Sequence, residues 1–392
     1  MAPIQRLRPY DGPSILSYGF RPFFLVGALY AGLAVPLWMA VFGGEVALPT
    51  AFARRDWHVH EMLYGYVAAV VAGFLLTAVP NWTGRLPLQG RPLLALVLAW
   101  AAGRAAVWTS AWTGWLPAAL ADLTFLLLLT AAVAREVVAG RNWRNLNVLA
   151  LLGLLLAGNA LFHVEAHLSG LAEYGTRVGI AASLVLVMLI GGRIVPSFTR
   201  NWLARENPGR MPAQSGAFDV AAMGFSIAAL VAWTAAPACY GTGALLILAG
   251  ALQVARLARW AGDRTVRDRL VLILHVAYAF VPLGFVLAGL AAFGFLAPGA
   301  GIHAWTGGAL GVMTLAVMSR ASLGHTGRPL AASAAIQVVY ACVVLSVLAR
   351  ICASAHPLWF GLLMPAAGIL WAAAFLGFGL AYWTVLTGPR LA

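Results

Sequence analysis

Long apolar stretches alternate with short polar segments along the whole sequence. A helix needs about 20 apolar residues to cross about 30 Å of hydrocarbon, and this criterion predicts about twelve membrane spans. Unpaired backbone groups are too costly in lipid, so the spans must be helical. They are expected near residues 18–42, 62–80, 92–109, 116–134, 146–163, 178–198, 217–236, 239–258, 270–291, 299–318, 331–352 and 357–386.

The segments between these spans are too short to fold as soluble domains, so residues 1–392 are expected to form one all-α transmembrane domain. By inspection, the two halves show no convincing repeat, which weakens the case for an inverted-repeat transporter. Hydrophobic residues make up 62% of the chain and charged residues 9%, whereas soluble domains carry about 25% charged residues. This composition excludes a soluble enzyme, a nucleic-acid-binding module and a disordered scaffold.

The net charge of +13 is carried by arginine alone, because all 25 basic residues are Arg. With the N-terminus inside, the cytoplasmic segments hold 18 Arg and the opposite side holds 4, while Arg21, Arg104 and Arg193 lie within spans. Under the positive-inside rule, both termini are expected in the cytoplasm. This distribution indicates a lipid bilayer as the surroundings of the chain and no nucleic-acid partner.

Histidines and acids near the span ends are the candidate functional residues. Burying a polar side chain at membrane depth costs free energy, so such residues usually have a function. Six of the eight histidines fall near the outer ends of spans: His58, His60, His163, His167, His303 and His356. Glu61, Glu165 and Asp122 accompany them. Imidazole binds haem iron, copper, zinc and non-haem iron, and a carboxylate can complete an iron site or orient a ligating His.

Spacing separates some of these histidines. His163 and His167 are four residues apart and face one side of a helix. His58 and His60 can share a metal only if His58 precedes the helix; otherwise each serves a different centre. We predict metal ligation by His58, His60, His163 and His303. Simple interfacial positions are the alternative for His167 and His356.

Three polar residues toward the cytoplasmic side have open roles. His275 could bind a cofactor or be a core histidine bonded to a neighbouring helix, and His325 could bind a cofactor or lie in a loop that binds lipid phosphate with Arg328. Arg193, like Arg104 in the third span, could pair with an anion such as a haem propionate or substrate, or extend to the inner interface. The segment Gly191–Pro196 is expected to break its helix.

Several stretches resemble the NnrS family. They are Leu16–Phe24, Trp57–Tyr66, Leu76–Arg85, Gly191–Trp202, Leu274–Tyr278, His303–Ala309 and Met318–Arg328. The resemblance implies a multi-pass bacterial inner-membrane protein of about twelve helices that contains haem and copper and is linked to nitric oxide and denitrification. The residues that the resemblance carries over are His58, His60, His163, His275, His303 and His325, with Glu61 and Arg193 as lesser candidates.

The functional hypothesis is a membrane protein that removes nitric oxide, with the reduction of two molecules to nitrous oxide as the candidate reaction. The expected cofactors are haem b and a second metal, either copper or non-haem iron. Glu61 and Glu165 are the candidate proton carriers, and the electron donor is not identified. The alternatives are a protein that binds nitric oxide or handles haem or copper without turnover, and a transporter of metals or small molecules.

Overall fold

The computed structural model describes residues 10–391, and within that range it contains helices and no β-strand. Twelve of its helical segments are long and apolar enough to cross a membrane, one for each expected span. The all-α, multi-pass fold is therefore confirmed. Arg6 and Arg8, which the orientation argument uses, lie outside the described residues.

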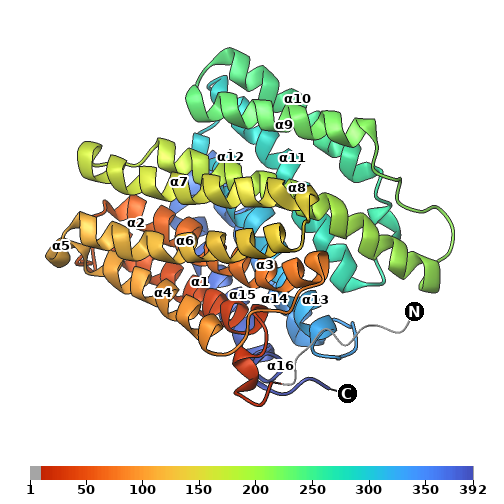
Figure 1. The fold of residues 1–392 in the computed structure, drawn as a ribbon. Helices are drawn as coiled ribbons and strands as arrows, with labels where there is room; N and C mark the ends of the chain where they lie inside the picture. Colours follow the sequence, from red (N-terminus) through yellow and green to blue (C-terminus); the bar gives the residue numbers. More distant parts are fainter. Residues whose placement is uncertain (1–9, 392) are drawn as a thin grey trace. The chain divides into compact units, whose positions relative to one another are not determined.

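The chain divides into two compact units. The first contains the described residues up to Ala182, together with Ala321–Arg328 and the residues from Gly379 onward. Its helices are α1 (Phe20–Gly43), α2 (Arg54–His60), α3 (Ala68–Thr83), α4 (Arg91–Trp108), α5 (Ser110–Thr113), α6 (Trp115–Ala139), α7 (Leu146–Ser169) and α16 (Trp383–Thr387). In this unit α6 packs between α4 and α7 (Figure 1).

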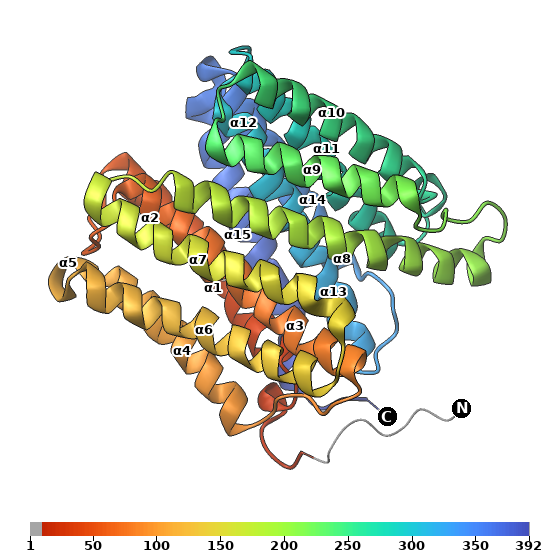
Figure 2. The same ribbon diagram turned by 45° about the horizontal axis from the view of Figure 1, so that its top comes forward.

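The second unit contains Ser183–Arg320 and Pro329–Phe378. Its helices are α9 (Ala217–Ala235), α10 (Tyr240–Ala258), α11 (Arg269–Ala292), α12 (Pro298–His303) and α14 (Ala334–Ala355). Figure 2 shows α10 packed beside α9 and α11. The boundary between the units falls within α8 (Tyr174–Glu206), α13 (Met313–His325) and α15 (Phe360–Ala381).

Within residues 10–391, two spans contain a π-helical segment, in which backbone hydrogen bonds join residues five apart rather than four. In the second span, the segment Glu61–Val67 connects α2 to α3. In the tenth span, the segment Ala304–Val312 connects α12 to α13. Each begins directly after a histidine, and π segments occur frequently at functional sites.

The structure corrects three details of the sequence prediction. The second span begins at Arg54 rather than near residue 62, so His58 lies inside a helix. α8 continues through Gly191–Pro196 with Pro196 in its interior, so the expected helix break is wrong. α13 extends to His325, which therefore ends a helix and does not lie in a loop.

Candidate metal centre

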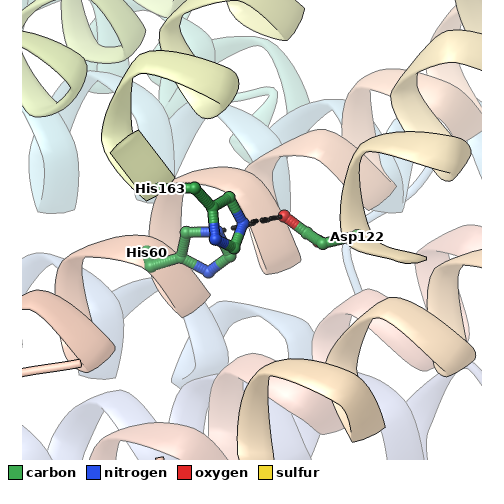
Figure 3. Close-up of side chains that lie close together, drawn as sticks. All are labelled: His60, Asp122 and His163. Carbon is green, nitrogen blue, oxygen red and sulfur yellow. Dashed lines mark hydrogen bonds and ion pairs between the residues drawn. The ribbon is translucent and has the colours of Figure 1, made fainter. Parts of the chain in front are cut away.

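His60, Asp122 and His163 come together inside the first unit (Figure 3). The same carboxylate oxygen of Asp122, Oδ2, lies 3.1 Å from Nε2 of His60 and 3.0 Å from Nε2 of His163. The three side chains are at most 3% exposed. They are the only His, Cys, Asp or Glu side chains in residues 10–391 found grouped closely enough to hold one metal ion.

Three helices supply these candidate ligands. His60 ends α2, Asp122 lies in α6 and His163 lies in α7. Asn159 precedes His163 by four residues on α7, so it faces the same side of the helix. Its Nδ2 donates to Asp122 Oδ2 at 2.7 Å, and its Oδ1 lies 3.0 Å from His60 Nε2. The amide thus fixes the carboxylate between the two imidazoles.

A second layer of polar groups holds His60. Its Nδ1 donates to Glu61 Oε1 at 2.9 Å, because an ionised carboxylate can only accept. This bond fixes the tautomer that leaves the Nε2 lone pair available, as in metal sites where a carboxylate orients a ligating histidine. Arg104 donates to Glu61 Oε1 at 2.8 Å and also pairs with Asp122, while the Tyr30 hydroxyl donates to Glu61.

With both imidazoles neutral, the charges of the buried cluster do not balance. Asp122 and Glu61 bring two negative charges, and Arg104 brings one positive charge. Arg104 is 8% exposed and the carboxylates are at most 2% exposed. A net negative charge in a low-dielectric interior is costly. A metal ion between two neutral imidazoles would offset this net negative charge.

The distances also fit a metal ion. Two ligand atoms that are each about 2.1 Å from one ion, at about 90° to each other, lie about 3.0 Å apart. Asp122 Oδ2 lies at this separation from both imidazole nitrogens. Two histidines and one carboxylate form the ligand set typical of non-haem iron sites that keep open coordination positions.

Aromatic rings surround the two imidazoles. The rings of Phe52, Phe162 and Tyr64 lie 5.0–5.4 Å from the His60 ring, measured between ring centroids. Phe162 and Tyr64 are fully buried. These apolar rings leave little room for water beside the imidazoles. The low local dielectric strengthens the electrostatic interactions among the polar groups of the centre.

His58 and His167 do not join this group. The ring of His58 stacks on Trp38, with centroids 4.1 Å apart. The ring of His167 is exposed and stacks on Trp115, with centroids 4.4 Å apart. Neither histidine belongs to the His60–Asp122–His163 group. Metal ligation by His58 remains a prediction.

Glu165 and His325 have structural contacts in the first unit. Glu165 accepts the backbone N–H groups of Tyr174 and Gly175 at 3.1 and 2.7 Å, and so caps the start of α8. The His325 ring stacks on Tyr18, with centroids 5.7 Å apart. Their roles in proton transfer and cofactor binding remain predictions.

In the second unit, His275 is buried on α11 and its Nε2 forms a 2.8 Å hydrogen bond with the Thr199 hydroxyl of α8. This contact matches the alternative of a core histidine bonded to a neighbouring helix. His303 donates from Nδ1 to the Gly299 carbonyl at 2.7 Å. Arg193 lies on the exposed side of the uninterrupted α8.

The sequence did not identify the full set of residues. The sequence predicts Asp122 only as an acid near the histidines. It predicts an anion partner or an interfacial position for Arg104, and the structure shows two carboxylate partners, Glu61 and Asp122. The sequence prediction includes neither Asn159 nor Tyr30. The available signals were an Asn one helical turn from His163 and an Arg within an apolar span.

Within residues 10–391, twelve candidate spans and a buried His-Asp-His group define a polytopic membrane protein with a candidate metal centre. The family model described as NnrS protein matches residues 14–390, nearly the whole chain. The chain belongs to the NnrS family. No individually curated protein matches it. Family membership and the helical fold together fit a bacterial membrane protein of the nitric oxide response.

Proposed function

We propose that this protein binds nitric oxide at a non-haem metal held by His60, Asp122 and His163, and reduces it. The observation that carries the proposal is that three possible ligand atoms from three helices meet in one buried site. With neutral imidazoles, this site has one more negative than positive charge. A ferrous or cuprous ion in such a site supplies an open position where nitric oxide binds. The carboxylate ligand favours iron over copper.

The surroundings of the centre suit an uncharged substrate that dissolves in lipid. Nitric oxide needs no polar channel to reach a site between membrane helices. Phe52, Phe162 and Tyr64 form an apolar wall next to the ligands. Water and anions are therefore excluded while a small neutral molecule can approach.

Reduction requires two electrons and two protons for each pair of nitric oxide molecules, giving one nitrous oxide and one water. A membrane reductant, with haem b as the second cofactor, supplies the electrons in this proposal. Tyr30, Glu61 and His60 form a hydrogen-bonded chain that ends at the ligands and can hold a proton beside them. Glu165 is the second candidate proton carrier, two residues beyond His163 on α7.

The test is purification in mild detergent, followed by metal analysis, a haem spectrum and nitric oxide consumption with an artificial reductant. Asp122→Asn and His163→Ala should each lose the non-haem metal and nitrous oxide release. His167→Ala is the matched control, because its ring is exposed one turn along the same helix. Retention of metal and turnover by both ligand variants would exclude this centre. Binding of nitric oxide without nitrous oxide release would exclude the reductase activity.

A further inference from the structure

The Nε2 atom of His60 faces two oxygen atoms. Because Nδ1 donates its hydrogen to Glu61 Oε1 at 2.9 Å, Nε2 of the neutral ring carries a lone pair. Asn159 Oδ1 lies 3.0 Å from this nitrogen, and Asp122 Oδ2 lies 3.1 Å from it. An amide oxygen and an ionised carboxylate can only accept hydrogen bonds. The three atoms therefore meet with their lone pairs and have no hydrogen to share.

The orientation of the Asn159 amide follows from its other partner. Its Nδ2 donates to Asp122 Oδ2 at 2.7 Å. If the amide were turned over, two acceptor oxygens would face each other at this distance and the hydrogen bond would be lost. Asn159 is fully buried, where an unpaired polar atom is costly. The amide oxygen therefore points toward His60.

Helix α7 directs two polar side chains into the centre from one face. Asn159 and His163 are four residues apart, and both are at most 3% exposed. His163 Nε2 lies 3.0 Å from Oδ2 of Asp122. The other oxygen of that carboxylate, Oδ1, pairs with Arg104, so Oδ2 is the oxygen left for a metal ion. Asn159 thus adds a fourth possible ligand atom to the three from His60, Asp122 and His163.

We propose that Asn159 is a fourth ligand of the metal centre and binds the ion through Oδ1. This inference rests on the non-haem centre of the proposed function. The 3.0 Å between Asn159 Oδ1 and His60 Nε2 is the separation of two ligand atoms that are each about 2.1 Å from one ion, at about 90° to each other. A cation between these atoms replaces the repulsion of their lone pairs by attraction.

The amide oxygen also affects which metal the centre prefers. Carboxylate and carbonyl oxygens suit hard divalent ions, and imidazole suits iron, whereas cuprous copper prefers soft sulfur ligands. A set of two imidazoles, one carboxylate and one amide oxygen therefore fits ferrous iron better than cuprous copper. Asn159 is the residue that adds the second oxygen, so it strengthens this selectivity.

The test compares metal binding by variants of Asn159 in the purified full-length protein. Asn159→Leu keeps the approximate size of the side chain but removes its oxygen. Loss of an outer hydrogen-bond partner costs about 10–100-fold in metal affinity, so loss of a ligand should lower the ferrous-iron affinity by at least about 100-fold. The cuprous affinity should fall less. Asn159→Asp keeps a ligand oxygen and should retain most of the ferrous-iron affinity.

Competition with chromophoric chelators measures these affinities. Asn81→Leu is the matched control, because Asn81 is exposed on α3 and its amide donates to the Thr77 carbonyl of the same helix. Cobalt(II) in place of the native metal gives a second readout, since its visible bands depend on the number of ligands. At saturating cobalt, Asn159→Leu should shift and intensify these bands. Bands identical to those of the wild type would overturn the proposal.

A role limited to hydrogen bonding gives a different pattern. Asn159 would then only orient Asp122 through Nδ2. Asn159→Asp lacks that donor and places a second carboxylate beside Asp122, so it should lose the metal as fully as Asn159→Leu. Equal loss in these two variants would overturn the assignment of Asn159 as a ligand.

Further outcomes separate this ligand from the proposed function. If Asn159→Leu keeps full affinity while Asp122→Asn and His163→Ala lose it, the ligand assignment fails and the three-residue centre stands. If metal binding follows the predicted pattern but the wild type releases no nitrous oxide, the reductase activity fails and the ligand assignment stands. If the wild type binds no non-haem metal, both fail, and His60 is an imidazolium that donates to both oxygens.

Discussion

The two ring nitrogens of His60 have different partners. Nδ1 donates to Glu61, while Nε2 lies near Asp122 and Asn159. This arrangement assigns Glu61 a positioning role in addition to its proposed proton transfer. The acceptor raises the basicity of the ring and would fix its orientation toward a metal ion held at Nε2.

Replacement of Glu61 by Gln should therefore weaken metal binding by about 10–100-fold, because the charged acceptor for His60 Nδ1 is lost. Competition with a chromophoric chelator would measure the change in affinity. Glu173→Gln is the control, since Glu173 is half exposed and, among residues 10–391, its ion pairs are those with Arg55 and Arg177. Equal affinities of the wild type and the Glu61 variant would contradict this role.

Arg104 joins both carboxylates of the centre and should contribute strongly to stability. Arg104→Met leaves two buried carboxylates without their guanidinium, which should cost about 3–5 kcal/mol. Arg85→Met removes the exposed pair with Glu136 and should cost at most about 1 kcal/mol. Thermal unfolding in detergent would compare the two variants. A similar loss in both would show that burial of the Arg104 pairs does not stabilise the fold.

Two glycines allow the helices around the candidate metal centre to approach closely. A Cβ at Gly65 would lie 2.7 Å from Arg104 Nη1, and a Cβ at Gly103 would lie 3.1 Å from Asp122 Oδ1. The π segment places Gly65 opposite α4, and Gly103 allows α6 to approach α4. Glycine at these positions leaves the space that the ion pairs occupy.

Gly65→Ala should therefore displace Arg104, destabilise the protein by about 1–3 kcal/mol and reduce its metal content. Gly153→Ala in α7 is the matched control, because a Cβ there meets no atom within 4 Å. Alanine favours the helix, so the control should be neutral or more stable by up to about 1 kcal/mol. Melting curves and metal analysis of both variants would test this. Full metal content in Gly65→Ala would contradict the argument.

The two units contain different kinds of buried polar cluster. In the second unit, Arg256 pairs with Asp219 and donates to Tyr278, which donates to Gln253, which donates to Ser226. Arg259 also lies 3.7 Å from Asp219. The carboxylate is therefore balanced, and this hydrogen-bonded chain has no negative charge left for a cation to neutralise. We assign this hydrogen-bonded chain a structural role. The cluster in the first unit differs, because with neutral imidazoles it has one more negative than positive charge.

Orientation in the membrane depends on the charge distribution of the whole chain. The excess of Arg on one side predicts a cytoplasmic C-terminus. Green fluorescent protein fused after Ala392 should therefore fluoresce, and alkaline phosphatase fused there should be inactive. Fusion in the segment after α1 should give the opposite pattern. Active phosphatase at the C-terminus would reverse the predicted orientation.

The sequence by itself determined the membrane class, the twelve spans and the family. Hydropathy is summed over one continuous segment, so packing against other helices does not change it. Boundaries were less accurate where a helix continued beyond its apolar stretch, as at Arg54 and His325. The motifs were also local, and they led to the family that matches nearly the whole chain.

Only the tertiary structure decided which polar residues act together. The sequence predicts His58 and His60 equally as metal ligands. In the structure, the His58 ring stacks on Trp38, whereas His60 contacts Asp122. Asp122 and Arg104 became partners because α4 and α6 pack closely at Gly103. A ligand set depends on the rotation and approach of separate helices, and no single segment of sequence contains that information.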